Sequence, residues 1–195
     1  AAEAAHFGGH TQPFGVTYQA PKIDGKAVMA RVKSERDRFV GFVKEDVEGW
    51  NEVNRIRAYA KFIDDHHLEL SDGQIIEADR IVIATGSSTF VPPPFKAFED
   101  RLIVNDDVFD WDDLPESVVI FGAGVIGLEL GQALHRLGVR VSLFGRDYLV
   151  GPLTDDVVKF KARETFMEEF PFYPHGEVTR MENVGDHVEI DFVED

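Results

Sequence analysis

A short apolar run that ends in three closely spaced glycines constrains this chain more than any other feature. Residues 118–121 read Val-Val-Ile-Phe, and Gly122, Gly124 and Gly127 follow in the spacing G-x-G-x-x-G. Residues 125–137 then carry apolar side chains at helical intervals. A buried strand, a glycine turn and a helix in this order are typical of the turn that binds a dinucleotide in α/β proteins.

Each of the three glycines has its own physical reason in such a turn. Gly122 permits a tight change of chain direction, and Gly124 lets the bare backbone approach a pyrophosphate. Gly127 allows the helix to pack closely on the strand. The phosphate charge would then lie against the free N–H groups at the start of the helix. The alternative is a packing turn in an α/β protein that binds no ligand.

The second half of the chain alternates strand and helix patterns. After the first strand and helix, residues 139–144 predict a second strand. Residues 154–169 predict a second helix, with Thr154 as its N-cap. Residues 172–175 predict a third strand, and 178–181 with 188–192 predict a hairpin. Such an alternation is the signature of a parallel sheet with helices on its faces.

The first half begins with a long helix. Asp24 is placed to cap a helix that runs to about Trp50. Apolar side chains recur along one stripe of it, at Val28, Val32, Phe39, Val43 and Val47. A small β region follows, with a strand at 56–62 and a hairpin turn at 71–74. Pro92-Pro93-Pro94 continues neither a helix nor a central strand and marks a boundary.

A second candidate binding segment lies in this first half. The continuous apolar run Ile81-Val82-Ile83-Ala84 predicts a strand buried on both faces. Thr85, Gly86 and Ser87 follow it directly, so a small residue and a flexible turn come where a cofactor can approach the backbone. The alternative is a strand end followed by an ordinary type II turn.

The residue at the end of the second parallel strand should distinguish NAD from NADP. An acid there would bind the ribose 2′-hydroxyl of NAD, whereas a nearby Arg favours a 2′-phosphate. This chain has Gly145 at that place and then Arg146, which can pair with a phosphate. Asp147 follows at once and could neutralise Arg146. The sequence therefore leaves both NAD and NADP open.

Composition excludes several classes of function. The 195 residues contain 20 Lys and Arg against 36 Asp and Glu, a formal net charge of −16. This balance argues against a nucleic-acid partner and against an anionic membrane surface. There is no Cys, so neither a disulfide nor a thiolate metal site can form within the chain, and we expect no metal. A reducing, cytoplasmic location fits this composition.

Four segments, in order along the chain, resemble the pyridine-nucleotide-disulfide oxidoreductases, the flavoproteins that include dihydrolipoamide dehydrogenase. They are residues 58–62 (Ala-Tyr-Ala-Lys-Phe), 81–87, the lead-in 113–117 (Asp-Leu-Pro-Glu-Ser) and the GAGVIGLE motif from Gly122. The resemblance implies an α/β fold with two parts. Residues 115–195 would form a Rossmann-like parallel sheet, part of an NAD(P) domain. Residues 1–114 would belong to an FAD-binding domain with a long helix and a small antiparallel β region.

The resemblance also implies roles for individual residues. Ala60 would lie by the FAD adenine, and the 85–87 segment by the FAD diphosphate and flavin. The glycine turn would hold the pyrophosphate of the nicotinamide cofactor, and Glu129 would help to orient its nicotinamide. Together with Arg146, the residues predicted to bind cofactor are Ala60, Thr85, Gly86, Ser87, Gly122, Gly124, Val125, Ile126, Gly127 and Glu129. Val125 is equally compatible with plain core packing, and Glu129 with a solvated helix position.

The function expected from this resemblance is hydride transfer between NAD(P)H and FAD in a larger disulfide oxidoreductase, of which this chain would be an interior part. The family's cysteine pair, its first FAD-binding glycine motif and its catalytic His–Glu pair are not in this sequence. We therefore expect no catalytic residue in this chain and no activity of the chain alone. The intact enzyme would be a homodimer acting on a small-molecule or protein-bound disulfide. The alternatives are a non-catalytic dinucleotide-binding module and an NAD(P)H-dependent flavin reductase or oxidase without a disulfide.

Overall fold

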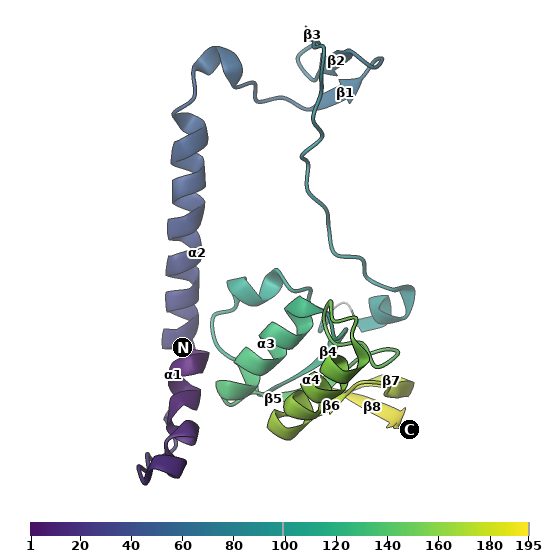
Figure 1. Cartoon of the computed structure of the whole chain (residues 1–195). Coiled ribbons are helices and arrows are strands. Elements are labelled where there is room, and N and C mark those ends of the chain that lie inside the picture. Colours follow the sequence, from purple (N-terminus) through teal and green to yellow (C-terminus); the bar gives the residue numbers. More distant parts are fainter. Residues whose placement is uncertain (99, 195) are drawn as a thin grey trace. The chain divides into compact units, whose positions relative to one another are not determined.

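The computed structural model describes residues 1–98 and 100–194, and for residues 9, 10 and 12 the backbone alone. The chain forms two compact units (Figure 1). One unit combines Ala1–Ser34 with Val91–Asp195, and the other is Glu35–Phe90. The expected boundary between FAD and NAD(P) domains near residue 114 concerns cofactor binding and stays a prediction.

The larger unit is built on a parallel sheet of three strands in the order β4-β5-β6. The strands are β4 (Ser117–Phe121), β5 (Arg140–Phe144) and β6 (Phe172–Tyr173). Helix α3 (Val125–Arg136) connects the first two, and α4 (Asp156–Glu169) connects the last two. The predicted strand-helix alternation and its parallel sheet are confirmed.

The two helices cover one face of this sheet and bury the core there. A Cβ added at Gly131 of α3 would lie 3.2 Å from Leu143 Cδ1 and 3.3 Å from Ile120 Cδ1, so helix and strands are in close contact. Leu143 pairs in register with Phe172, whose ring meets Phe166 of α4. The fully buried Leu143 is the centre of a cluster with Leu128, Leu134, Val139, Val141, Val150, Phe170 and Phe172.

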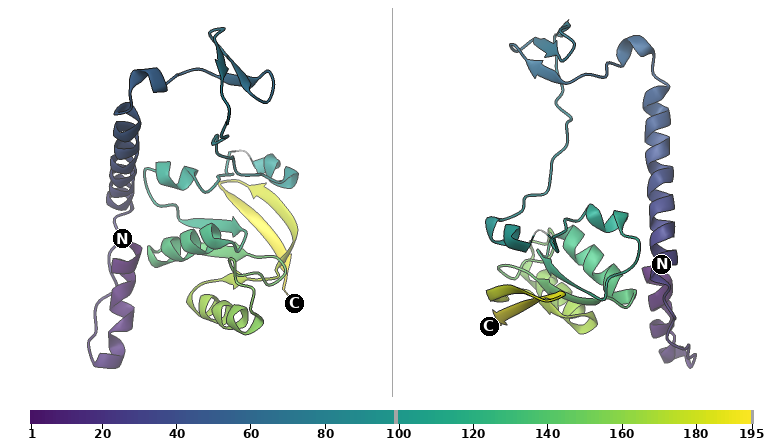
Figure 2. Two further views of the ribbon diagram at one scale, coloured as in Figure 1. Left: turned by 45° about the horizontal axis from the view of Figure 1, so that its top comes forward. Right: turned by 180° about the vertical axis from the view of Figure 1, so that it is seen from behind.

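A hairpin of two strands packs on the opposite face (Figure 2). It consists of β7 (Glu177–Val184) and β8 (His187–Val193), which pair antiparallel as predicted but are longer than expected. Phe144 follows Leu143 and so points to the other face of the sheet. Its ring lies 5.0 Å from the Phe192 ring of β8. The central strand β5 is therefore covered by the helices on one face and by the hairpin on the other.

Two details of this unit correct the expectations. Strand β4 forms, but it is not buried: it lies at the sheet edge, and Val119 and Phe121 are both 41% exposed. The N-cap of α4 is Asp155 and not Thr154, because the Asp155 carboxylate accepts hydrogen bonds from the N–H groups of Val157 and Val158, each 3.0 Å long. A charged acceptor also interacts favourably with the positive end of the helix dipole.

The N-terminal region is helical. Helix α1 (Ala2–His6) is followed by the 3-10 turns η1 (Phe7–His10) and η2 (Gln12–Phe14). Helix α2 (Gly25–Glu48) begins as predicted, since Asp24 Oδ1 accepts a hydrogen bond of 3.0 Å from the Ala27 N–H.

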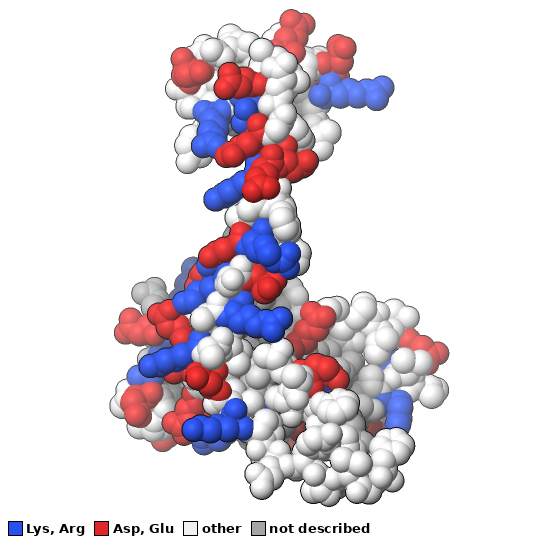
Figure 3. Space-filling view, turned by 90° about the vertical axis from the view of Figure 1, so that its left-hand side faces the viewer, with Lys and Arg blue, Asp and Glu red and all other residues white. Residues whose placement is uncertain are grey.

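The predicted apolar stripe of α2 has two different environments. Its first part, at Val28 and Val32, is half-buried, whereas Phe39, Val43 and Val47 are exposed. Local ion pairs such as Arg38 with Glu35 stabilise the exposed part. In the view of Figure 3, acidic and basic side chains are interspersed over much of the surface that faces the viewer.

The smaller unit contains a three-stranded antiparallel sheet in the order β1-β2-β3. Its strands are β1 (Ala60–Phe62), β2 (His67–Leu70) and β3 (Ile75–Glu77), and η3 (Glu52–Asn54) precedes them. The predicted hairpin turn at 71–74 is confirmed by the hydrogen bond of 2.9 Å from the Gly73 N–H to the Leu70 carbonyl. The first strand is shorter than expected and begins at Ala60, not Ile56.

The expected buried strand at 81–84 is wrong for this structure. Residues 79–92 have no regular secondary structure, and Val82 and Ile83 are 87% and 71% exposed. A strand is buried only when neighbouring strands accept its hydrogen bonds and elements cover its faces. No described segment of the chain pairs with this apolar run. Beyond it, η4 (Pro93–Phe98) and η5 (Asp107–Asp110) lead into the parallel sheet.

A cluster of hydrogen-bonded polar side chains connects α4 to α3. Glu169 accepts hydrogen bonds from Arg136 Nε at 2.6 Å and from Gln132 Nε2 at 2.7 Å, and Arg136 also pairs with Glu3 of α1 at 2.9 Å. Burial by itself raises the pKa of Glu169, but the hydrogen bonds from Arg136 and Gln132 and the positive charge of Arg136 outweigh it, so the pKa is lowered. Glu169 therefore carries its charge when the unit is folded at neutral pH.

This cluster predicts a specific pH dependence of stability. Because the folded-state pKa of Glu169 lies below its unfolded value, its stabilisation is complete above the unfolded pKa and is lost as the pH falls through the folded-state pKa. We expect Glu169→Gln to lower the free energy of unfolding by about 1 kcal/mol at pH 7. The difference from wild type should shrink towards about pH 3.

Thermal unfolding followed by circular dichroism at several pH values measures this effect. Glu168→Gln removes an exposed carboxylate from the same helix and is the matched control. A difference between Glu169→Gln and wild type that stayed constant over the whole pH range would contradict the assignment.

Candidate dinucleotide-binding site

The glycine turn between β4 and α3 has the geometry that the spacing predicts. Gly122 has φ of +117°, a conformation that favours glycine, and its N–H donates a hydrogen bond of 2.8 Å to the Phe144 carbonyl. A Cβ added at Gly122 or Gly124 would meet no atom within 4 Å. At Gly127, by contrast, it would lie 2.1 Å from the Gly122 carbonyl oxygen. The turn is thus tight at Gly127 and open to its surroundings at Gly124.

The first N–H groups of α3 have no acceptor in the part of the chain that the structure describes. The first hydrogen bond of the helix runs from the Leu128 N–H to the Gly124 carbonyl and is 3.0 Å long. No described residue accepts a hydrogen bond from the N–H groups of Val125, Ile126 or Gly127. Such amides, together with the positive end of the helix dipole, attract an anion. The open space at Gly124 leaves room for one, so these residues fit a pyrophosphate.

Val125 and Glu129 are placed together beside this turn. They are one helical turn apart on the same side of α3, and both are exposed. Both line a largely apolar groove of about 220 Å³ between α3, the loop after β5 and α4. The other residues of this groove are Leu128, Gln132, Val150, Gly151, Pro152, Leu153, Ala162 and Phe166.

The loop after β5 lies next to the glycine turn. The Gly151 N–H donates a hydrogen bond of 2.7 Å to the Ala123 carbonyl. A Cβ at Gly145 would lie 3.0 Å from the Pro174 carbonyl oxygen and 3.2 Å from Ala123 Cβ, so an acidic side chain there would require its neighbours to shift. Arg146 is exposed, and it forms no ion pair with Asp147 among the described contacts. The expected neutralisation by Asp147 is therefore not observed.

The residues predicted to bind FAD belong to the smaller unit. Ala60 begins β1 and is exposed. Thr85, Gly86 and Ser87 lie in the irregular segment after β3 and are also exposed, and Gly86 has φ of +72°. These residues belong to the smaller unit, whereas the glycine turn belongs to the larger one. Their role in binding FAD stays a prediction.

A second cavity, which sequence reasoning missed, lies beside the loop after β5. It has a volume of about 300 Å³ and is lined by Tyr148, Phe160, Arg163, Glu164, Met167, Pro174, His175 and Glu194. These residues come from four separate segments of the chain, so no local motif could have revealed them. Among the described residues, no group of three or more His, Cys, Asp or Glu is arranged to hold a metal ion. None of the described helices could cross a membrane.

Comparison with known proteins identifies the family of this chain. A family model described as "Pyridine nucleotide-disulphide oxidoreductase" matches residues 17–194. The chain belongs to this family. Its members combine nicotinamide and flavin cofactors, so the family expected from the four sequence segments is confirmed.

Curated relatives of this chain are oxidoreductases. A soluble pyridine nucleotide transhydrogenase of Photorhabdus laumondii is 32% identical over 149 residues, which are 72% of this chain and 32% of that protein. Dihydrolipoyl dehydrogenase 2, mitochondrial, of Arabidopsis thaliana is 27% identical over 198 residues, covering 96% of this chain and 37% of that protein. The chain thus spans about a third of the length of the curated relatives it matches.

Solved structures show the same fold. The Cu(II) complex of the HOCl-induced flavoprotein disulfide reductase RclA from Escherichia coli matches with a TM-score of 0.69 at 21% identity. The match covers 84% of this chain and 39% of that one. The predicted α/β class, with a parallel sheet, a long helix and a small antiparallel sheet, is confirmed.

Proposed function

We propose that this chain binds NAD(P)H through the turn from Gly122 to Gly127 and acts in an FAD-dependent oxidoreductase that passes hydride between nicotinamide and flavin. One observation supports this most: the first amides of α3 lack acceptors among the described residues, and a Cβ at Gly124 would meet open space. Membership in the pyridine nucleotide-disulphide oxidoreductases supports the same cofactors.

The residues of this chain would bind and orient the dinucleotide. The N–H groups of Val125, Ile126 and Gly127 would donate to the pyrophosphate oxygens, and the dipole of α3 would offset their charge. Glu129, one turn further along the helix, would accept a hydrogen bond from the nicotinamide amide and fix the orientation of its ring. When bound, the nicotinamide supplies or accepts the hydride.

The FAD and disulfide parts of the proposal rest on other residues. Ala60, Thr85, Gly86 and Ser87 would contact FAD. Because the chain contains no Cys, a redox-active disulfide would have to come from outside these 195 residues. The substrate would be a small-molecule or protein-bound disulfide, and the working enzyme a homodimer.

A second candidate reaction needs no disulfide. The relative named soluble pyridine nucleotide transhydrogenase supports hydride exchange between nicotinamide nucleotides. The lack of Cys in this chain agrees with that reaction as well as with the first. Both candidates require the same nucleotide site on α3.

A titration tests this shared requirement. Nicotinamide fluorescence should show that NADH and NADPH each bind saturably, with one molecule per chain. ADP, which carries the pyrophosphate, should displace them, whereas AMP at equal concentration should displace them less. Failure of both nucleotides to bind the folded chain would contradict the proposed function. Binding with no effect of added FAD would favour a dinucleotide-binding module.

A further inference from the structure

The loop after β5 holds two residues in a rare backbone conformation. Asp147 and Tyr148 have φ of +54° and +55°, and the Leu149 N–H donates a hydrogen bond of 3.1 Å to the Arg146 carbonyl. Positive φ at both central positions is the geometry of a type I′ turn. A bulky side chain such as that of Tyr rarely adopts it, and strain of this kind persists where the surroundings hold it and is concentrated at functional sites.

The surroundings of Tyr148 fix both its backbone and its ring. Its N–H donates a hydrogen bond of 3.2 Å to the Pro174 carbonyl. Its ring stacks on that of His175, with centroids 4.8 Å apart and planes 18° apart. The guanidinium carbon of Arg163 lies 5.0 Å from the Tyr148 ring centroid and 5.5 Å from that of Phe160. The strained turn therefore presents a rigid aromatic and cationic surface.

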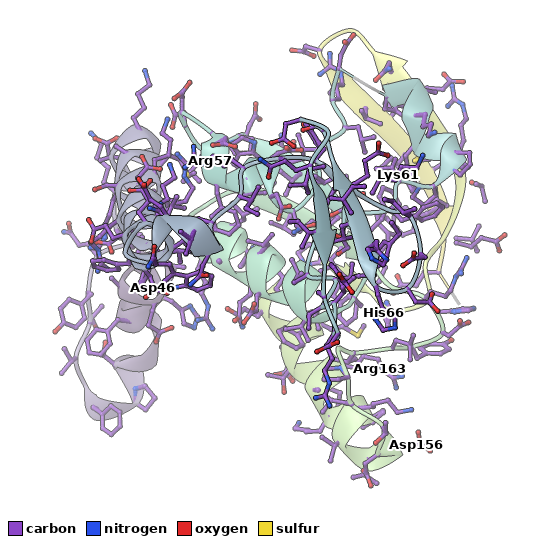
Figure 4. The ribbon with its side chains drawn as sticks, turned by 90° about the horizontal axis from the view of Figure 1, so that it is seen from above. Asp46, Arg57, Lys61, His66, Asp156 and Arg163 are labelled. Atoms are coloured by element: carbon purple, nitrogen blue, oxygen red, sulfur yellow. The ribbon has the colours of Figure 1, made fainter. Side chains whose placement is uncertain are left out.

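This surface lines the cavity of about 300 Å³. Figure 4 shows Arg163 on α4, about two turns beyond Asp156. No described carboxylate forms an ion pair with Arg163, although the chain has 36 acidic against 20 basic residues. Two acidic residues, Glu164 and Glu194, line this cavity. The Glu164 carboxylate is paired with the Lys161 ammonium at 3.3 Å. A half-buried guanidinium without a carboxylate partner favours an anionic ligand.

The cavity lies where the adenosine half of a bound dinucleotide would reach. Tyr148 follows β5 and His175 follows β6, so both lie at the same edge of the parallel sheet as the glycine turn after β4. Neighbouring strands are about 5 Å apart. The loop is also tied to the turn directly, through the hydrogen bond from Gly151 to Ala123. A pyrophosphate at the turn would thus direct its adenosine half along this edge.

We propose that Arg163, positioned by Tyr148, binds the 2′-phosphate of NADP(H) and makes this chain prefer NADP(H) to NAD(H). The inference rests on the proposed nucleotide site at Gly122–Gly127. A guanidinium stacked on an aromatic ring keeps its outward N–H groups available for two parallel hydrogen bonds to phosphate. Arg163 would therefore act as a second cation beside Arg146, and Gly145 leaves no acid to bind a free 2′-hydroxyl.

NADH and NADPH differ only in the 2′-phosphate and are the probes for this inference. We expect the 195-residue chain to bind NADPH about tenfold more tightly than NADH. Arg163→Met should weaken NADPH binding about tenfold and change NADH binding less than about twofold. Arg163→Lys, which keeps the charge and loses the planar fork, should give an intermediate loss.

Arg140→Met is the matched control, because it removes one exposed Arg from the opposite end of β5. It should change the affinity for neither nucleotide, and circular dichroism should show the same fold for all variants. Equal wild-type affinities for NADH and NADPH would overturn this inference and leave the nucleotide site standing. An equal loss of both in Arg163→Met would also overturn it. Failure of wild type to bind either nucleotide would contradict the proposed function itself, and this inference with it.

Discussion

Gly127→Ala is expected to destabilise the larger unit by about 3 kcal/mol, because its methyl group has no space. The added Cβ would lie 2.1 Å from the Gly122 carbonyl oxygen and 3.3 Å from the Gly122 carbonyl carbon. Both are backbone atoms, so neither can rotate away as a flexible side chain would. The start of α3 must move off β4, and this movement also opens the contact of Gly131 with Leu143.

Urea unfolding followed by circular dichroism measures this loss. Gly41→Ala is the control for a helical glycine with free space around it: Gly41 lies in the part of α2 that belongs to the smaller unit, and an added Cβ there would meet nothing within 4 Å. This control should be stabilised by about 0.5–1 kcal/mol, since Ala favours a helix more than Gly does. If Gly127→Ala unfolded at the same urea concentration as wild type, the close approach of helix and turn would be refuted.

Local patterns sufficed to predict the larger unit. The β4–α3–β5–α4–β6 order follows from short apolar runs, helical periodicity and glycine at the turns, and each of these signals lies within about a dozen residues. The three glycines of the turn also behave as their spacing indicates: Gly122 has positive φ, Gly124 is open, and Gly127 is in contact. Such features are determined by residues close together in the chain, so they can be predicted from a single sequence.

Features that depend on distant partners were not predictable in this way. The apolar run at 81–84 has the composition of a buried strand, but burial requires neighbouring strands that composition cannot supply. The same limit applies to β4, whose position at the sheet edge follows from strand order. The cavity at Tyr148 forms only where α4 and the segments after β6 and β8 come together in the folded chain. Its strained turn contains no Gly or Asn-Gly, the residues from which such a turn is usually predicted.

The N-cap of α4 shows a smaller ambiguity, which is local in origin. Thr154 and Asp155 are both good capping residues, and they differ by one position. The backbone geometry decides between them, because Asp155 has the extended φ and ψ of a cap and reaches two N–H groups. A sequence pattern fixes such a boundary only to within a residue or two.

Gly124→Ala is expected to separate ligand binding from stability. Gly124 has φ of −72° and ψ of 175°, which any residue adopts, and a Cβ there would touch no atom of the protein. The free energy of unfolding should therefore stay within about 0.5 kcal/mol of wild type. The methyl group would, however, occupy the space in which a pyrophosphate must approach the first amides of α3. Its affinities for NADH and NADPH should both fall about 100-fold, or about 2.7 kcal/mol.

Fluorescence titration of the two nucleotides, with urea unfolding of the same preparations, checks both halves of this expectation. Arg163→Met provides the contrast, because it should weaken NADPH binding alone, whereas Gly124→Ala removes the contact with the pyrophosphate that both nucleotides share. Unchanged affinity of a stably folded Gly124→Ala variant would show that the amides of α3 do not hold the ligand. The open turn would then serve only to pack α3 against β4, and the nucleotide would have to bind elsewhere.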